Sequence, residues 1–74
     1  MPLTLTLKVN GETRVLDPAP DPANLAAVVD QLANNPQLVV AEHNGVIAPR
    51  SSWETTLVKD DDTLEIVTIV GGGS

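Results

Sequence analysis

The chain has 74 residues, enough for one small domain with a thin hydrophobic core. It contains no cysteine, which excludes a disulfide framework, a thiol nucleophile and a thiolate metal site. Ten acidic residues against four basic ones give a net charge of −6, which disfavours nucleic acid and anionic membranes as partners. This charge either favours partners with basic docking surfaces or serves only solubility. Because no apolar run is long enough for a membrane span or a signal peptide, we expect a cytoplasmic protein.

The first two elements are predicted to form a hairpin. Residues 3–9 alternate leucine or valine with threonine or lysine, the period of a half-buried strand. Asn10-Gly11 follows, and this dipeptide favours a type I′ turn, which needs positive φ at both positions. Residues 12–16 are then the expected returning strand.

A helix is predicted after a proline-containing loop at residues 17–20, where the prolines exclude a helix or a central strand. Asp21 is the expected N-cap and Pro22 the expected first helical residue. The helix is expected to cover roughly three turns and to end at Asn34-Asn35-Pro36, since the residue before a proline avoids the α region. One apolar stripe at helical spacing should lie on a sheet, and it contains Leu25, Val28, Val29 and Leu32.

The second half of the chain begins with a further pair of strands. Residues 38–43 predict a strand whose first three side chains are all apolar, which suggests that it is covered on both faces. Asn44-Gly45 is a second turn signal. Residues 46–48 predict a short strand that Pro49 ends.

The segment from Arg50 to the last strand is less regular. Residues 50–54 predict a single helical turn, in which Trp53 is expected to be a core or half-core residue. Residues 55–58 fit no one element. Residues 59–62 form a polar turn, and their three adjacent aspartates lack the glycine spacing and closing glutamate of an EF-hand loop. A solvated turn is therefore expected in place of a cation site.

Two charged or titratable side chains, Arg50 and His43, are candidate functional groups. Arg50 is expected to bind local carbonyl groups or the acidic turn, the alternative being a carboxylate on a partner. His43 has no partner at catalytic spacing, so a structural or surface role is expected. The chain contains no nucleophile with a base, no metal-ligand set and no Walker-type phosphate loop, which disfavours an enzyme.

The chain closes with a strand and a glycine tail. Residues 64–70 are rich in β-branched side chains, and three glycines follow that have no side chain to extend the packing. We therefore expect one domain over residues 1–70 and a flexible tail over residues 71–74. The tail is either a working end that enters a narrow channel or a frayed terminus or linker.

The order of elements predicts an α+β fold in which one helix lies across a mixed sheet. The compact solution is a β-grasp with the first and last strands as its central parallel pair. Side chains alternate along a strand, so Val67 and Ile69 lie on the face opposite Leu64 and Ile66. If the helix covers the face of Leu64, the pair Val67 and Ile69 is either an exposed docking surface or covered by neighbouring strands.

Several motifs from Ala41 onward stand in one order: Asn44-Gly45, Val46 to Arg50, Trp53, an acidic turn, Leu64 to Val67, and Val70 to Gly73. This set resembles the ThiS family, the sulfur-carrier proteins of thiamin thiazole biosynthesis, whose fold is the ubiquitin-like β-grasp. The molybdopterin-synthase small subunit and the ubiquitin-like sulfur carriers share the fold and the terminal Gly-Gly. The segment with Pro49-Arg50 and Trp53 favours the thiazole branch.

The resemblance implies a carrier and not an enzyme. A ubiquitin-activating-type enzyme would use ATP and magnesium to adenylate the terminal glycine carboxylate, and the carrier itself would bind no cofactor. A persulfide from a cysteine desulfurase pathway would supply sulfur, and thiazole synthase would accept it from the resulting thiocarboxylate. Alternatives are a carrier of another sulfur pathway, such as the molybdopterin type, and a ubiquitin-like protein modifier.

The implied site is the tail and the strand before it. Gly73 is the expected acceptor at the end of the tail Gly71, Gly72 and Gly73, and the expected docking residues are Val67, Ile69 and Val70. One departure is Ser74, because members of the family end at glycine. We expect that Ser74 is removed by processing or was added to the natural chain.

Overall fold

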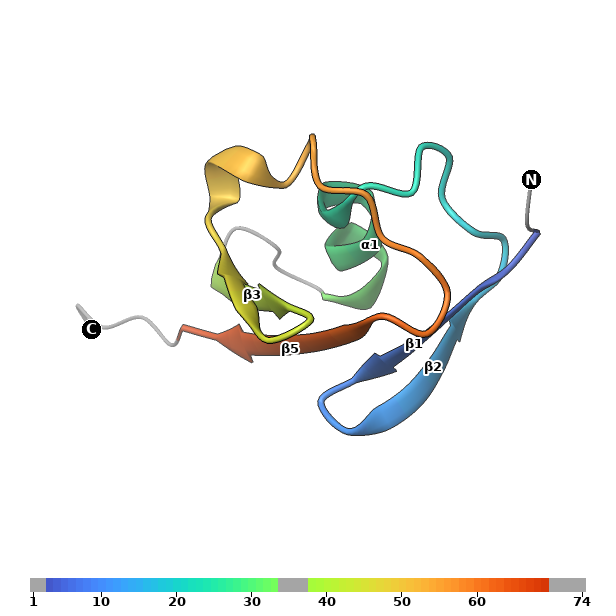
Figure 1. Ribbon diagram of the computed structural model, residues 1–74, viewed down its shortest axis with the longest axis horizontal. Coiled ribbons are helices and arrows are strands. Elements are labelled where there is room, and N and C mark those ends of the chain that lie inside the picture. Colours follow the sequence, from blue (N-terminus) through green and yellow to red (C-terminus); the bar gives the residue numbers. More distant parts are fainter. Residues whose placement is uncertain (1–2, 34–37, 70–74) are drawn as a thin grey trace.

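The computed structural model describes residues 3–33 and 38–69. These residues form an α+β fold in which one helix crosses one face of a five-stranded mixed sheet (Figure 1). No helix in these two ranges has the length and apolar character needed to cross a membrane. The elements are β1 (Leu5–Val9), β2 (Glu12–Leu16), α1 (Leu25–Leu32), β3 (Val39–His43), β4 (Val46–Ala48) and β5 (Thr63–Thr68).

The strand order is β2-β1-β5-β3-β4, so the last strand lies at the centre of the sheet. β5 pairs with β1 in parallel, with Lys8 opposite Thr63 and Val9 opposite Leu64. On its other side β5 pairs with β3 in antiparallel orientation. The predicted β-grasp, with the first and last strands as a parallel pair, is therefore confirmed.

Both Asn-Gly turns have the predicted conformation. φ is 51° at Asn10 and 84° at Gly11, and 52° at Asn44 and 85° at Gly45. Positive φ at both positions is what a type I′ hairpin requires. The first turn joins β1 to β2 and the second joins β3 to β4.

The two asparagines also hold β5 in place. The Asn10 side chain accepts a hydrogen bond from the backbone N–H of Ile66 at 2.7 Å and donates one to its carbonyl at 3.1 Å. The Asn44 side chain accepts one from the backbone N–H of Thr63 at 2.9 Å. These amides satisfy backbone groups of β5 where the neighbouring strands have turned away, so the sequence of each turn also fixes the position of the central strand.

The predicted start of the helix is wrong. α1 begins at Leu25, and its N-cap is Asn24, whose side chain accepts a hydrogen bond from the Ala27 N–H at 2.8 Å. Asp21 and Pro22 lie outside it, and the helix is eight residues long, just over two turns and not three.

A contact distant in sequence explains the shorter helix. The Ala23 carbonyl accepts a hydrogen bond from the Val58 N–H, and the Leu25 N–H donates to the Thr56 carbonyl, each at 2.8 Å. Asn24 and Leu57 form a bridge between these bonds. The ambiguous segment at residues 55–58 is thus partly an extended chain, and its pairing keeps residues 23 and 24 out of the helix.

The core lies between α1 and one face of the sheet. Three residues of the predicted stripe, Leu25, Val28 and Val29, are fully buried, and Leu32 is partly buried. Trp53 is 3% exposed, and its indole N–H donates to the Ala48 carbonyl at 2.9 Å, so its predicted core role is confirmed. Burial of a side chain the size of Leu64, which is also fully buried, stabilises the fold by about 1.5–3 kcal/mol.

The start of β3 is not covered on both faces, as its apolar run had suggested. Val39 is buried, but Leu38 and Val40 are 43% and 40% exposed. The reason is that α1 covers only one face of the sheet, so alternate side chains of β3 point away from it. The predicted strand end at residue 70 falls outside the described residues, and β5 itself ends at Thr68.

Candidate functional site

The sheet face that α1 leaves uncovered carries an apolar surface near the end of β5. Val67 is the partner of Val40 across β3 and β5, and the Ile69 N–H donates to the Leu38 carbonyl, which continues this register. Ile47 joins them from β4. Residues directly opposite one another in paired strands share a face. We call this surface the open-face patch, which consists of Leu38, Val40, Ile47, Val67 and Ile69.

All five side chains of the open-face patch are exposed, between 40% for Val40 and 66% for Ile47. Val67 and Ile69 are exposed, at 61% and 52%, and are not covered by neighbouring strands. Exposed apolar surface of this kind is typical of sites that contact another protein. The role of these two residues in docking stays a prediction, because exposure alone identifies no partner.

Leu38, Val40 and Ile47 were not anticipated as members of this surface. The signal that identifies them is the register of β3 on β5, with Val40 opposite Val67. The apolar composition of residues 38–40 was visible in the sequence, but composition does not specify the register of two strands.

Val67 and Ile69 of the open-face patch lie shortly before the glycine tail in sequence. Figure 1 shows the C-terminal end of β5 pointing away from the β1–β2 hairpin. Ile69 is the last residue that the structure describes. The other predicted site residues, Val70, Gly71, Gly72 and Gly73, lie outside the described residues.

Arg50 borders this surface beyond β4. Its guanidinium carbon lies 4.2 Å from the centre of the Trp53 ring, a cation–π contact that the sequence did not indicate. Val40, Ile47 and Arg50 line the same shallow hollow, together with Pro49 and Trp53. The apolar surface therefore has a cationic border on its β4 side.

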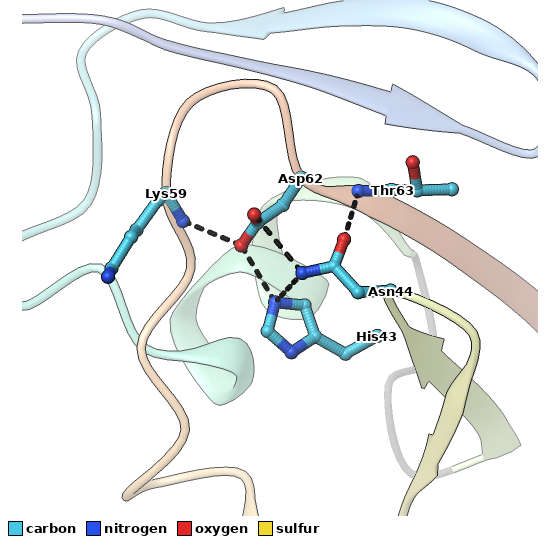
Figure 2. Close-up of polar contacts among 5 residues, drawn as sticks. All are labelled: His43, Asn44, Lys59, Asp62 and Thr63. Carbon is cyan, nitrogen blue, oxygen red and sulfur yellow. Dashed lines mark hydrogen bonds and ion pairs between the residues drawn. The ribbon is translucent and has the colours of Figure 1, made fainter.

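The acidic turn before β5 is hydrogen-bonded to residues at the β3–β4 turn (Figure 2). The Asp62 carboxylate accepts hydrogen bonds from His43 Nε2 at 2.7 Å, from the Lys59 backbone N–H at 2.9 Å and from the Asn44 side chain at 3.2 Å. Burial raises the pKa of Asp62, but these bonds lower it by more, so its pKa lies below the ordinary value of 3.8. The network fixes the entry into β5.

The predicted structural role of His43 is thus confirmed. The turn is solvated as expected, since Lys59, Asp60 and Asp61 are exposed and Asp62 is half-buried. Asp62 is held as described, and a carboxylate oxygen of Asp60 accepts the backbone N–H of Thr6 at 2.8 Å. Within residues 3–33 and 38–69 no group of three or more histidine, cysteine or acidic side chains is placed to bind a metal ion. Asp62 thus binds the backbone of the turn itself, and Asp60 joins the turn to β1.

Comparison with known proteins places this geometry in a family. The model of the ThiS family matches residues 7–73, which begin within β1 and include the other four strands, α1 and the three glycines. The chain belongs to the ThiS family. This membership supports a sulfur carrier, the function that the order of motifs had implied.

Relatives of known structure and sequence agree with the ThiS family assignment. The crystal structure of the thiamine biosynthesis protein ThiS from Geobacter metallireducens matches with a TM-score of 0.76 and 30% identity, over 93% of this chain and 100% of that one. The uncharacterized protein ycf40 of Trieres chinensis is 40% identical over 50 residues, 68% of either chain.

One relative is a much longer protein. A protein named thiazole synthase, from Paramagnetospirillum magneticum, is 36% identical over 70 residues, which are 95% of this chain but 21% of that protein. A region similar to this ThiS-family chain therefore occurs within a chain that carries the name of a thiazole-forming enzyme.

Proposed function

We propose that this protein carries sulfur as a thiocarboxylate on Gly73 and donates it to thiazole synthase in thiamin biosynthesis. The observation that carries the proposal is that the ThiS family model matches through Gly73 and stops one residue short of Ser74. The carrier is a substrate of other enzymes and not itself a catalyst. The reaction is assigned to the cytoplasm, where thiols and persulfides remain reduced.

Activation is needed because a carboxylate is anionic and resonance-stabilised and so is a poor electrophile. The partner enzyme uses ATP and magnesium to join AMP to the Gly73 carboxylate, releasing pyrophosphate. The terminal sulfur of a persulfide, supplied by a cysteine desulfurase pathway, then attacks the carbonyl and displaces AMP. A thiol cleaves the acyl disulfide that results and leaves the thiocarboxylate. Glycine suits this position because a channel that admits no Cβ excludes every other residue.

The open-face patch is the docking surface in this proposal. Val67 and Ile69 contact the adenylating enzyme together with Val70, while the residues after them reach its active site. Four extended residues span about 13–14 Å, enough to bring the Gly73 carboxylate from the sheet into an enclosed site. The exposed apolar side chains beside the tail support this arrangement.

The test is the intact mass of the carrier after incubation with a ubiquitin-activating-type enzyme, ATP, magnesium and a sulfur donor. Two forms are compared, one ending at Gly73 and one ending at Ser74. We expect the Gly73 form to gain the mass of one oxygen-to-sulfur exchange and the Ser74 form to remain unchanged. Conversion of the Ser74 form with the serine still attached would reject Gly73 as the acceptor.

The choice of the thiazole pathway is supported by the longer relative named thiazole synthase. Incubation of the thiocarboxylate form with thiazole synthase and its other substrates should return the carrier to its carboxylate mass. A carrier that keeps its sulfur there but yields it to a molybdopterin-synthase large subunit would favour the other pathway. Isopeptide-linked adducts on lysine side chains would indicate a protein modifier.

A further inference from the structure

Two glutamates face each other on the same open face as the patch. Glu42 of β3 and Glu65 of β5 are direct partners in the antiparallel ladder. In the same ladder the Asn44 N–H donates to the Thr63 carbonyl, two positions away. Because hydrogen-bonded pairs recur every second residue, Glu42 and Glu65 are also such a pair, with Cα atoms about 5.5 Å apart. Like charges directly opposite one another destabilise a sheet.

Nothing in the described part of the chain compensates this repulsion by direct contact. Within residues 3–33 and 38–69, neither carboxylate takes part in a hydrogen bond or an ion pair. Lys8 is on the same face of β1, but its partner in β5 is Thr63, and no ion pair joins it to either glutamate. Arg50 lies against Trp53 beyond β4.

The acidic pair adjoins the open-face patch on two sides. Ile47 is the partner of Glu42 in β4, and Val67 follows Glu65 by two residues in β5, about 6.6 Å along the strand. The open face is therefore apolar at the end near the tail and doubly anionic behind it. A surface that keeps a destabilising charge pair beside exposed apolar side chains is complementary to a partner with an apolar centre and a nearby cation.

We propose that the open face binds one protein partner, the enzyme that receives the tail, and that a lysine or arginine of that enzyme enters between Glu42 and Glu65. The proposal rests on the carrier function above. It adds that the Glu42–Glu65 pair selects the partner. Ile69 and Glu65 are four residues apart, so the cation lies about 13 Å behind the contact made by Ile69. Binding relieves the repulsion that the free carrier contains.

The same pair disfavours self-association through this face. A symmetric contact between two copies would bring the same surface together twice and so gather four glutamates. With a net charge of −6 on each chain, this contact would be strongly repulsive. The open-face patch can therefore remain exposed in the free carrier without pairing with a second copy.

The experiment measures binding of the full chain to its adenylating enzyme by surface plasmon resonance at low and high salt. The variants are E42Q/E65Q, the conservative E42D/E65D, and E12Q as a control that removes a negative charge from β2. We expect E42Q/E65Q to lower the association rate about 5- to 10-fold at low salt and less than about 2-fold at 0.5 M salt. E42D/E65D and E12Q should stay within about 2-fold of the unchanged chain.

Thermal unfolding of the free carrier gives the second readout. Removal of the repulsion should raise the Tm of E42Q/E65Q by about 1–4 °C, so weaker binding cannot come from loss of fold. An association rate for E42Q/E65Q equal to that of E12Q would overturn the proposal, even if the unchanged chain is converted to thiocarboxylate. Failure of the unchanged chain to be converted would instead overturn the carrier function and this inference with it.

Discussion

Side chains alternate along β5, so one face of the strand is buried and the other is exposed. Leu64 is fully buried and Ile66 partly buried beneath α1, whereas Glu65 and Val67 are exposed on the other face. One face holds the fold together and the other remains exposed. Within residues 3–33 and 38–69, α1 is the only α-helix and covers one face of the five-stranded sheet, so the other face is left exposed.

The largest loss of stability is expected when Leu64, on the buried face, is truncated. Leu64→Ala removes a fully buried side chain and leaves a cavity, which should lower the free energy of unfolding by about 2–5 kcal/mol. Chemical denaturation monitored by Trp53 fluorescence measures this free energy, because Trp53 lies in the same core. A loss below about 1 kcal/mol would mean that the helix-covered face does not carry the stability.

A smaller loss of stability is expected when Asn10, whose side chain binds the backbone of β5, is replaced. Asn10→Ala forces alanine to a φ of 51° and removes two hydrogen bonds to Ile66, which together should cost about 2–3 kcal/mol in unfolding free energy. The matched variant Asn10→Gly tolerates the positive φ and loses only the hydrogen bonds, so it should cost about half as much. Equal losses in the two variants would assign the effect to the side-chain bonds alone.

The Asp62 network predicts a dependence of stability on pH. The pKa of Asp62 is lower in the folded chain than its ordinary value of 3.8, so folding favours the carboxylate. Its contribution is fully present above 3.8 and is lost as the pH falls through the lower folded pKa. Asp62→Asn should cost about 1 kcal/mol at neutral pH and flatten this part of the acid-unfolding curve.

The matched control for that variant is Asp61→Asn, in the same turn. No hydrogen bond to the Asp61 carboxylate is found among the described residues. Its acid-unfolding curve should therefore parallel that of the unchanged chain. If Asp61→Asn and Asp62→Asn flatten the curve equally, the effect belongs to the charge of the turn and not to the bonds of Asp62.

The smallest stability effect is expected on the open face. Val67→Ala should change the free energy of unfolding by less than about 0.5 kcal/mol, because the side chain is 61% exposed. The same variant should weaken binding to the adenylating enzyme about 5-fold or more if the open-face patch docks it. Val15→Ala is the control, because Val15 is 57% exposed on β2 and lies outside the patch. Equal binding by both variants would remove Val67 from the docking surface.

Local sequence signals predicted most of the fold. The two Asn-Gly turns, the alternation in β1 and the stripe of α1 each depend on neighbouring residues, and each is confirmed. The start of the helix was missed because residues 23–25 pair with residues 56–58, a contact that no local pattern encodes. The exposure of Leu38 and Val40 was missed because three adjacent apolar residues do not reveal how many helices cover a sheet.

The candidate site was predictable in part for the same reason. Val67 and Ile69 follow from alternation along a single strand. The acidic pair of Glu42 and Glu65 depends on the register between β3 and β5, which are distant in sequence, and only the assembled sheet provides that register.

The central claim is that both faces of the sheet serve to present the tail, which alone carries the sulfur. It is tested most directly by single-turnover sulfur transfer to thiazole synthase from a chain ending at Gly73 and from a chain ending at Val70, which keeps both faces. We predict that the shorter chain has the same unfolding temperature and still binds the adenylating enzyme, but forms no thiocarboxylate and delivers no sulfur. Sulfur delivery by the shorter chain at the rate of the longer one would contradict the account.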